Sequence, residues 1–402
     1  MRPAVGRAAL RVAVDARSLL CRHPRGEGKS LLRLYNTVLE QRSDLEVIFF
    51  GDSSASGFDR SLPDTIRVVI LPTVTSRFNA WENLLFPLGA KIAGCNVMHC
   101  TSSGAPWRTL MPMVMTVHDL IPILFEDGQS AGDSKLFFRR LRRGLHQAAV
   151  VMTVSNHTCQ DLLKTFPMLE RRPHVVHWGA EPLIDRSPSA PGVPTVLVFG
   201  GEARRKNTDY TIDRFIGAAK RVPGLRLQLV GISSAIQRTA VQHKIEAAGL
   251  TGGVSMIGFV SEALLADMMR NSTLLLYLSL YEGFGLPLVE AIGCGLPVIA
   301  SDRTSIPEIL SSGAGCFDLS NPQAIEDAIV GLCVDARSRK RYAARQAALL
   351  PRFDWAVAAQ SVLTALETAM AASRSAQTLP PDPNSRLEKT TNSYPPQEKP
   401  ND

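Results

Sequence analysis

Short apolar runs recur along the first half of the chain with a spacing that predicts parallel β-strands. They cover residues 10–16, 45–51, 66–72, 96–101, 113–119 and 150–155. Because the runs are almost continuously apolar, they are typical of strands covered on both faces. Helical patterns lie between or after them, as over 30–41 and 156–165. This alternation predicts a doubly wound α/β domain that binds its ligand at the carboxyl ends of the strands.

The same pattern starts again after a segment rich in Pro, Ser and Gly. Residues 181–194 have the composition of an interdomain linker. Beyond it, apolar runs at 195–201, 225–231, 273–280 and 296–301 again alternate with helical patterns. We therefore expect two Rossmann-like domains that face each other across a cleft, residues 1–180 and residues 195–371. The last segment, 372–402, is rich in Pro, Ser, Thr, Asn and charge, which predicts a disordered tail.

Composition and charge narrow the classes of partner. The chain is 45% hydrophobic and 20% charged, as in ordinary globular proteins. A net charge of +7 suits a polyanionic ligand or an anionic membrane surface, and it is too evenly spread to indicate nucleic acid. The 7 cysteines lack metal-ligand spacing, and the apolar stretch near the N-terminus is interrupted by Arg11 and Asp15. We expect a cytoplasmic protein with reduced thiols, no signal peptide and no bound metal.

A Gly-Lys-Ser tripeptide at residues 28–30 raises the question of ATP hydrolysis. The phosphate-binding loop of nucleotide hydrolases needs a further glycine five positions before Gly28, and that position holds His23. The tripeptide instead follows the first predicted strand and enters the first predicted helix. We therefore interpret it as a glycine-rich turn near a ligand phosphate and not as an ATPase loop.

The segment 281–302 carries the most specific chemistry. Gly283 and Gly285 lie between a predicted strand and a predicted helix, where free amides and the helix dipole form an anion site. Glu282 ends the strand, and Glu290 lies about one turn into the helix. Two carboxylates around a phosphate-binding turn suit a ligand with both a diphosphate and sugar hydroxyls. A nucleoside diphosphate sugar is such a ligand.

The motif formed by Glu282 and Glu290, with seven residues between them, resembles the donor site of family-4 retaining glycosyltransferases. The resemblance implies the GT-B fold and extends over most of residues 10–365. Within the family, the chain looks like the mannosyltransferases. Each further match is weak alone, but together they are specific. These matches are the segments 117–122, 153–158, 175–181, 204–207 and 304–310.

The resemblance implies catalytic roles for two residues. Glu282 would contact the transferred sugar and stabilise an oxocarbenium-like transition state, and His118 would hydrogen-bond the donor sugar. Each has a structural alternative. Glu282 could cap the next helix, and His118 could be a buried residue that donates to a backbone carbonyl. The residues alone do not identify a catalytic base. The resemblance implies that none is needed, because in retaining enzymes of this fold the leaving phosphate accepts the proton of the acceptor.

The resemblance also implies a set of donor-binding residues. Glu290 would hold the ribose hydroxyls, and the cations of the Arg-Lys pair would neutralise the diphosphate in place of a metal. The alternatives are that Glu290 is a solvated helix residue and that the Arg-Lys pair is ordinary surface charge. The turn amides would hold the distal phosphate, and the first glycine-rich turn would approach the donor. The donor-binding set is Gly28, Arg205, Lys206, Gly283, Phe284, Gly285, Leu286 and Glu290.

One departure from the family pattern lies beside these cations. Many members have an arginine five residues before the lysine, where this chain has Gly201. Arg204 or Arg205 would replace it, and the sequence leaves open which of them contacts the diphosphate. Downstream, Ser305 and Glu308 either line the nucleoside pocket or, for Ser305, cap the following helix.

The resemblance implies transfer of a hexose to a glycan or lipid-linked acceptor in bacterial surface polysaccharide or lipopolysaccharide synthesis. GDP-mannose or a GDP-deoxyhexose is the donor expected, as a co-substrate with no cofactor. Two alternatives stay open: a catalytically silent GT-B subunit that binds a sugar nucleotide, and a nucleotide-sugar epimerase. The basic segment 134–147 suggests peripheral contact with the cytoplasmic face of the inner membrane, although a packed helix with a basic exposed face has the same pattern.

Overall fold

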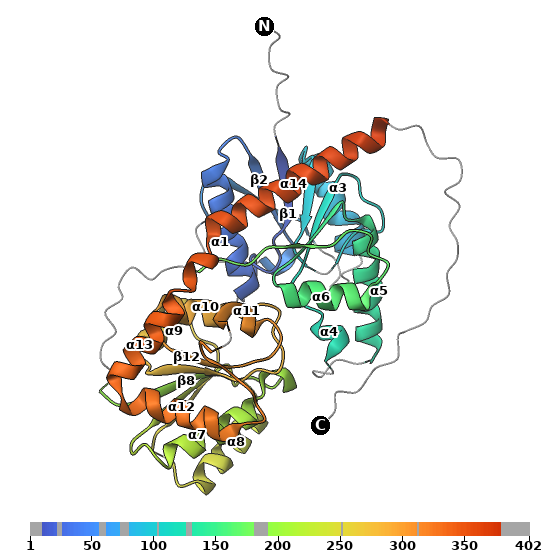
Figure 1. The fold of residues 1–402 in the computed structure, drawn as a ribbon. Helices are drawn as coiled ribbons and strands as arrows, with labels where there is room; N and C mark the ends of the chain where they lie inside the picture. The colour runs from blue at the N-terminus through green and yellow to red at the C-terminus, as the bar shows by residue number, and fades with distance from the viewer. Residues whose placement is uncertain are drawn as a thin grey trace.

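The computed structural model describes residues 10–21, 26–55, 62–72, 80–102, 104–125, 131–180, 192–250, 252–311 and 313–378. They form two α/β units, each built on a parallel sheet (Figure 1). Most of the expected linker (181–191) and the end of the expected tail (379–402) lie outside the described residues.

The N-terminal sheet has seven parallel strands in the order β3-β2-β1-β4-β5-β6-β7. The order reverses between β1 and β4, so a crevice is expected at their carboxyl ends. The strands are β1 (Arg11–Asp15), β2 (Glu46–Gly51), β3 (Ile66–Ile70), β4 (Val97–Cys100), β5 (Met113–Val117), β6 (Val150–Thr153) and β7 (His174–Val175). The helices are α1 (Gly26–Gln41), η1 (Ser53–Ala55), η2 (Trp81–Leu85), α3 (Phe86–Ile92), α4 (Ile121–Leu124), α5 (Ala131–Gln147) and α6 (Asn156–Thr165).

The C-terminal sheet has six parallel strands in the order β10-β9-β8-β11-β12-β13, with its own reversal between β8 and β11. The strands are β8 (Thr195–Phe199), β9 (Arg226–Val230), β10 (Val254–Ile257), β11 (Leu274–Tyr277), β12 (Val298–Ser301) and β13 (Cys316–Phe317). The helices are η3 (Arg204–Lys206), α7 (Thr208–Ala219), α8 (Ala235–Ala247), α9 (Glu262–Asn271), α10 (Leu286–Gly293), α11 (Ile306–Leu310), α12 (Pro322–Val334), α13 (Ala336–Ala347), η4 (Leu350–Arg352) and α14 (Trp355–Thr378). The predicted fold class, two Rossmann-like α/β domains, is confirmed.

The last helix, α14, crosses back and packs on the N-terminal domain (Figure 1). It lies against α1 and the β4–β6 part of the first sheet, and Arg42 pairs with Glu367 at 2.7 Å. The predicted C-terminal domain ends at residue 371, and the predicted tail begins at residue 372. Both boundaries differ from the structure, because the buried small and aliphatic side chains of α14 cover the first sheet and the helix continues to Thr378.

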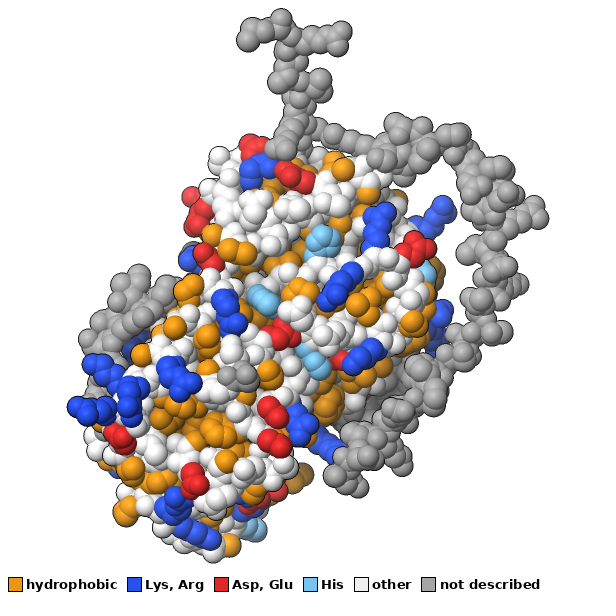
Figure 2. Space-filling model, in the orientation of Figure 1, with side chains coloured by type: hydrophobic (Ala, Val, Ile, Leu, Met, Phe, Trp, Pro, Cys, Tyr) orange, Lys and Arg blue, Asp and Glu red, His pale blue; other side chains and the backbone are white. Residues whose placement is uncertain are grey.

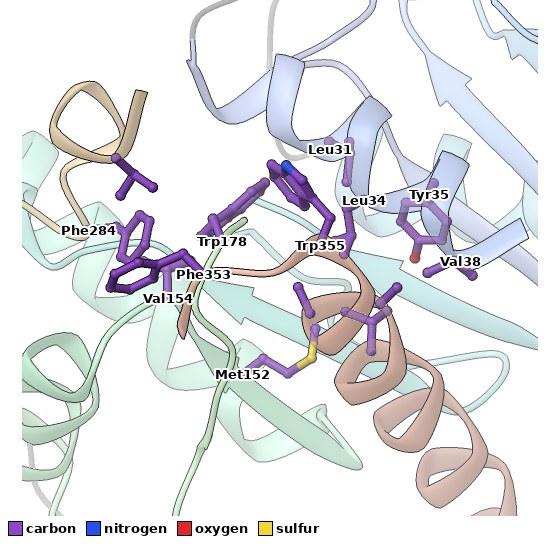
Figure 3. Packing of buried hydrophobic residues seen from close by; sticks show 14 of the residues in the cluster. Leu31, Leu34, Tyr35, Val38, Met152, Val154, Trp178, Phe284, Phe353 and Trp355 are labelled. Atoms are coloured by element: carbon purple, nitrogen blue, oxygen red, sulfur yellow. The ribbon is translucent and has the colours of Figure 1, made fainter. Parts of the chain in front are cut away.

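An aromatic cluster joins the two domains beside the start of α14. Figure 3 shows Trp178 and Trp355 close to Phe284 and Phe353. The ring centroids of Trp178 and Trp355 are 5.9 Å apart in an edge-to-face arrangement, and those of Phe284 and Phe353 are also 5.9 Å apart. Because Phe284 belongs to the predicted donor turn, this packing fixes that turn relative to the N-terminal domain.

Candidate active site

The structure brings three predicted site residues together at the reversal point of the C-terminal sheet. Arg205 and Lys206 lie on η3 after β8, and Glu282 lies in the loop after the neighbouring strand β11. Lys206 Nζ is 2.8 Å from Glu282 Oε1, and Arg205 Nη1 is 3.5 Å from Glu282 Oε2. Two cations and one carboxylate therefore form a charged cluster where this fold binds ligands.

The environment of Glu282 favours its ionised form. The residue is only 8% exposed, and burial alone would raise its pKa. The nearby Lys206 ammonium and Arg205 guanidinium outweigh that effect and hold the pKa of Glu282 below its ordinary value. Lys206 also donates to the Tyr277 hydroxyl at 3.4 Å and lies over the Tyr277 ring. Glu282 and Tyr277 thus together fix the position of the Lys206 ammonium.

The turn after η3 explains how the cations are placed. Asn207 adopts a left-handed conformation with φ of 51°, which Asn tolerates better than most residues. Its side-chain amide donates to the Leu278 carbonyl at 3.0 Å, and the Arg205 carbonyl accepts from the Leu280 amide at 2.7 Å. Since Arg204 is exposed to solvent and Arg205 faces Glu282, Arg205 is the arginine that belongs to the charged cluster.

The turn at 283–285 touches the N-terminal domain directly. A Cβ on Gly283 would overlap the carbonyl oxygen of His118, so only glycine fits there without a shift. Gly285 has φ of 105° and forms the N-cap of α10 without a side-chain cap. Ser305 donates its hydroxyl to the carbonyls of this turn, 3.0 Å from that of Glu282 and 2.8 Å from that of Phe284. Ser305 therefore supports the donor turn and does not cap α11 through its side chain.

The remaining predicted donor residues fall into different environments. The Phe284 side chain is buried and stacks on His177 with centroids 5.9 Å apart, so any ligand contact must come from its backbone. Leu286 begins α10 and lies near Gly26, where a Cβ would be 3.3 Å from Leu286 Cδ1. Glu290 is solvent-exposed on α10.

His118 follows β5 and faces the donor turn through its carbonyl. Its Nε2 is 2.9 Å from the Thr101 carbonyl oxygen and 3.4 Å from Glu27 Oε1, and its ring is tilted against Trp178. In this structure the ring therefore adopts the structural alternative, hydrogen-bonded to a backbone carbonyl. The ring remains partly exposed, and the His118 carbonyl oxygen lies against Gly283, the residue after Glu282.

Gly28 has a packing role that the sequence did not indicate. It is buried on α1, and a Cβ there would overlap the backbone of Ser18 in the loop after β1. Its neighbour Lys29 pairs with Glu262 of α9 at 3.1 Å. The glycine-rich turn thus holds α1 close to β1 and links the two domains, besides any contact with a donor.

Three further residues of the junction were not singled out for interdomain contact. Thr158 Oγ1 lies 3.2 Å from the His118 carbonyl oxygen and 3.1 Å from that of Gly283. Tyr281 donates its hydroxyl to Asp161 at 2.6 Å. Glu308, a candidate for the nucleoside pocket, accepts from the Asn156 and His157 amides of the N-terminal domain. In the space-filling view, His side chains and carboxylates gather where the domains meet (Figure 2).

The basic helix α5 is not a uniformly exposed face. Arg140 pairs with the buried Glu82, and burial together with Arg17 and Arg143 lowers the pKa of Arg140. Arg143 lies over the exposed ring of Trp107, 5.0 Å from its centroid. Arg140 and Arg143 of the predicted basic surface therefore pack against residues of their own domain.

No cluster of three or more metal-ligating side chains occurs within the part of the chain that the structure describes. Over the same residues, no helix has both the length and the apolar character needed to cross a bilayer.

Family comparisons agree with this geometry. A model described as Glycosyltransferase Family 4 matches residues 25–182, and a model described as Glycosyl transferases group 1 matches residues 181–348. The chain belongs to glycosyltransferase family 4. Like the fold class, this family assignment was predicted from the motifs, and it is confirmed.

Individual family-4 relatives are only moderately similar. A phosphatidyl-myo-inositol mannosyltransferase of Mycobacterium leprae is 29% identical over 46% of this chain and 50% of its own length. An alpha-maltose-1-phosphate synthase of Mycolicibacterium smegmatis is 28% identical over 63% of this chain and 72% of its own length. The chain thus spans about half of the first relative. A sucrose-phosphate synthase from Thermosynechococcus elongatus has a TM-score of 0.70 at 18% identity, over 90% of this chain and 100% of that chain, which shows the shared GT-B fold.

Proposed function

We propose that this family-4 protein transfers a hexosyl group from a nucleoside diphosphate sugar to a saccharide or lipid-linked acceptor, with retention and without a metal. The observation that carries the proposal is the cluster of Glu282, Lys206 and Arg205 at the reversal point of the C-terminal sheet. A buried carboxylate between two cations can stabilise both charges that develop when a glycosyl diphosphate bond breaks. One cluster thus serves the leaving group and the sugar.

The proposed chemistry uses these groups directly. Lys206 and Arg205 bind the diphosphate and neutralise the negative charge that grows on it as the bond to the sugar C1 breaks. Glu282 faces the positive charge on the sugar ring. The acceptor hydroxyl forms the new bond to C1 on the same face, and its proton passes to the departing diphosphate oxygen. His118, across the domain junction, orients the sugar.

The donor proposed first is GDP-mannose. The motif set resembles that of mannosyltransferases, and the Mycobacterium leprae relative is named as one. Another relative is named alpha-maltose-1-phosphate synthase, after a product that contains no mannose, so a panel of donors is needed. A bacterial surface glycan or its lipid-linked precursor is the acceptor class proposed.

Turnover of nucleotide sugars tests the function. Purified protein is incubated with GDP-, UDP-, ADP- and dTDP-sugars, and release of nucleoside diphosphate is measured with and without acceptors. We expect Glu282→Gln to lower kcat by about 100-fold, because removing one preorganised charge from an active site has an effect of that order. The matched control is Glu170→Gln, at an exposed acidic position.

The products separate the alternatives. NMR of the glycosidic product checks retention of the anomeric configuration. An isomerised donor formed without acceptor would indicate an epimerase, and tight binding without turnover would indicate a silent subunit. Unchanged turnover in Glu282→Gln would contradict the site.

We also propose peripheral membrane contact through a basic-aromatic surface, defined as Leu84, Leu88, Trp107 and Arg143. Leu84, Leu88 and Trp107 are 53%, 43% and 59% exposed, and the Trp107 amide is tied to Asn83 beside Leu84. Tryptophan beside a basic side chain favours the interface of an anionic bilayer.

A Leu84→Ser/Leu88→Ser variant should sediment with phosphatidylglycerol vesicles about ten-fold less than wild type. Ile236→Ser, at an 84% exposed position of the other domain, is the control, and equal sedimentation of all three proteins would contradict the proposal.

A further inference from the structure

Glu308 of the C-terminal domain is bound by groups of the N-terminal domain. Its carboxylate oxygens accept from the backbone amides of Asn156 at 2.8 Å and His157 at 2.6 Å. The Asn156 side-chain amide lies at 3.1 Å, and His177 Nε2 also lies at 3.1 Å. Both backbone donors belong to the first turn of α6 (Figure 1).

These contacts complete a helix N-terminus across the domain junction. The N-cap Ser155 accepts from the Thr158 amide. The amides of the two preceding residues have no partner within their own helix, as at every helix start, and Glu308 binds them. Burial would raise the pKa of Glu308, but the hydrogen bonds from His177 and the α6 amides lower it below the ordinary value. The carboxylate is therefore ionised and is only 18% exposed.

The first two turns of α6 also contact the loops that carry the proposed reactive residues of both domains. Thr158 lies between the carbonyls of His118 and Gly283, and Asp161 accepts from Tyr281 next to Glu282. A shift of α6 relative to α11 would therefore change the distance between His118 and the charged cluster. Catalysis is sensitive to such shifts, because an error of about 1 Å in position can lower a rate by about 100-fold.

We propose that Glu308 is a positioning residue for transfer, acting as an interdomain latch that docks α6 onto α11 and so sets the His118 loop against the donor turn. This inference rests on the proposed function for its effect on rate. The docking itself rests only on the contacts of Glu308. The described contacts of its carboxylate are with Asn156, His157 and His177, so in this proposal it acts through α6.

Two variants remove the latch from opposite sides. Glu308→Ala removes the acceptor. Asn156→Pro removes the backbone and side-chain donors of one residue at the first helical position, which Pro favours, and Ser155 before it is already extended, with φ of −152° and ψ of 161°. Asn156→Ala, which keeps the backbone amide, is the matched control, and Glu308→Gln, which keeps an acceptor oxygen, is the conservative replacement.

The readouts separate positioning from a general loss of stability. For Glu308→Ala and Asn156→Pro we expect kcat to fall at least ten-fold. The Kd for whichever of GDP, UDP, ADP and dTDP stabilises wild type most in a thermal-shift screen should change less than two-fold, because the described contacts of the Glu308 carboxylate are with the N-terminal domain and not with Lys206 or Arg205. The radius of gyration from small-angle X-ray scattering should rise in both variants. Glu308→Gln should recover part of kcat, and the double variant should be no slower than the slower single one, since both remove one contact.

Opposite results overturn the proposal. A double variant whose losses multiply, or an unchanged kcat and radius of gyration in Glu308→Ala, would show that the contact does not position the domains. If wild type turned over no nucleotide sugar, the proposed function would fail, and the scattering comparison would still decide whether Glu308 holds the domains together.

Discussion

At the residue scale, Glu282 and Lys206 form a charge pair that is largely removed from water. Their side chains are 10% and 19% exposed, and the atoms are 2.8 Å apart. Breaking such a pair by neutralising one partner leaves the other charge buried and incompletely solvated. The pair therefore contributes to the stability of the folded protein, besides its proposed role in binding a diphosphate.

The pH dependence of stability tests this pair. Since the pKa of Glu282 is lowered on folding, its ionised form stabilises the protein above the unfolded pKa of about 4.3, and this contribution is lost as pH falls through the folded pKa. We expect Glu282→Gln to lower the free energy of unfolding by about 2 kcal/mol at pH 7. Urea denaturation of both proteins at pH 7 and at progressively lower pH should show this difference shrinking below about pH 4. A difference that stays constant with pH would argue against the pairing.

Single site residues were predictable where a motif fixes their place. Glu282, Arg205 and Lys206 follow strands that are neighbours in a doubly wound sheet, so their convergence follows from topology. The contacts of Glu308 and Thr158 were not predictable. They depend on how two domains dock, and no local pattern in one domain encodes the donors presented by the other.

At the element scale, near-continuous apolar runs predicted the long strands of both sheets. The two-residue strands β7 and β13 are too short to show any periodicity, and β10 is only partly buried. The sequence predicts that residues up to 371, most of α14, belong to the C-terminal domain. The apolar face of this helix indicates burial, but it does not indicate which sheet the helix covers. Only contacts in the folded structure, such as that of Arg42 with Glu367, show that α14 covers the N-terminal domain.

The donor turn, residues 283–285, packs closely on the loop between β5 and α4, which contains His118. A methyl group on Gly283 would overlap the His118 carbonyl oxygen. We expect Gly283→Ala to lower kcat about ten-fold or more, because the turn and the His118 loop must separate. The matched control is Gly331→Ala in α12, where a Cβ meets no atom within 4 Å and helix propensity favours Ala. It should keep full activity and unfold at a slightly higher temperature. Equal activity of the two variants would contradict the close approach.

At the scale of the whole molecule, the two sheets direct their carboxyl edges toward one junction. The aromatic cluster around Trp178 and Trp355, the return of α14 and the Glu308 contacts all join the domains there. Two-domain organisation was predictable from the repeated strand–helix pattern. The closeness of the domains was not, since it depends on side chains that are far apart in the sequence.

The proposed function depends above all on the binding of the donor diphosphate by Lys206 and Arg205. Calorimetric titration with the nucleoside diphosphate identified by the donor panel tests it most directly, using wild type, Lys206→Met and the control Arg204→Met. We expect a Kd at least about ten-fold weaker for Lys206→Met, because a hydrogen bond to a charged group contributes about 1.5–3 kcal/mol. Arg204→Met should bind within two-fold of wild type, since Arg204 is exposed and Arg205 faces the cluster. Equal affinity of wild type and Lys206→Met would contradict diphosphate binding by Lys206.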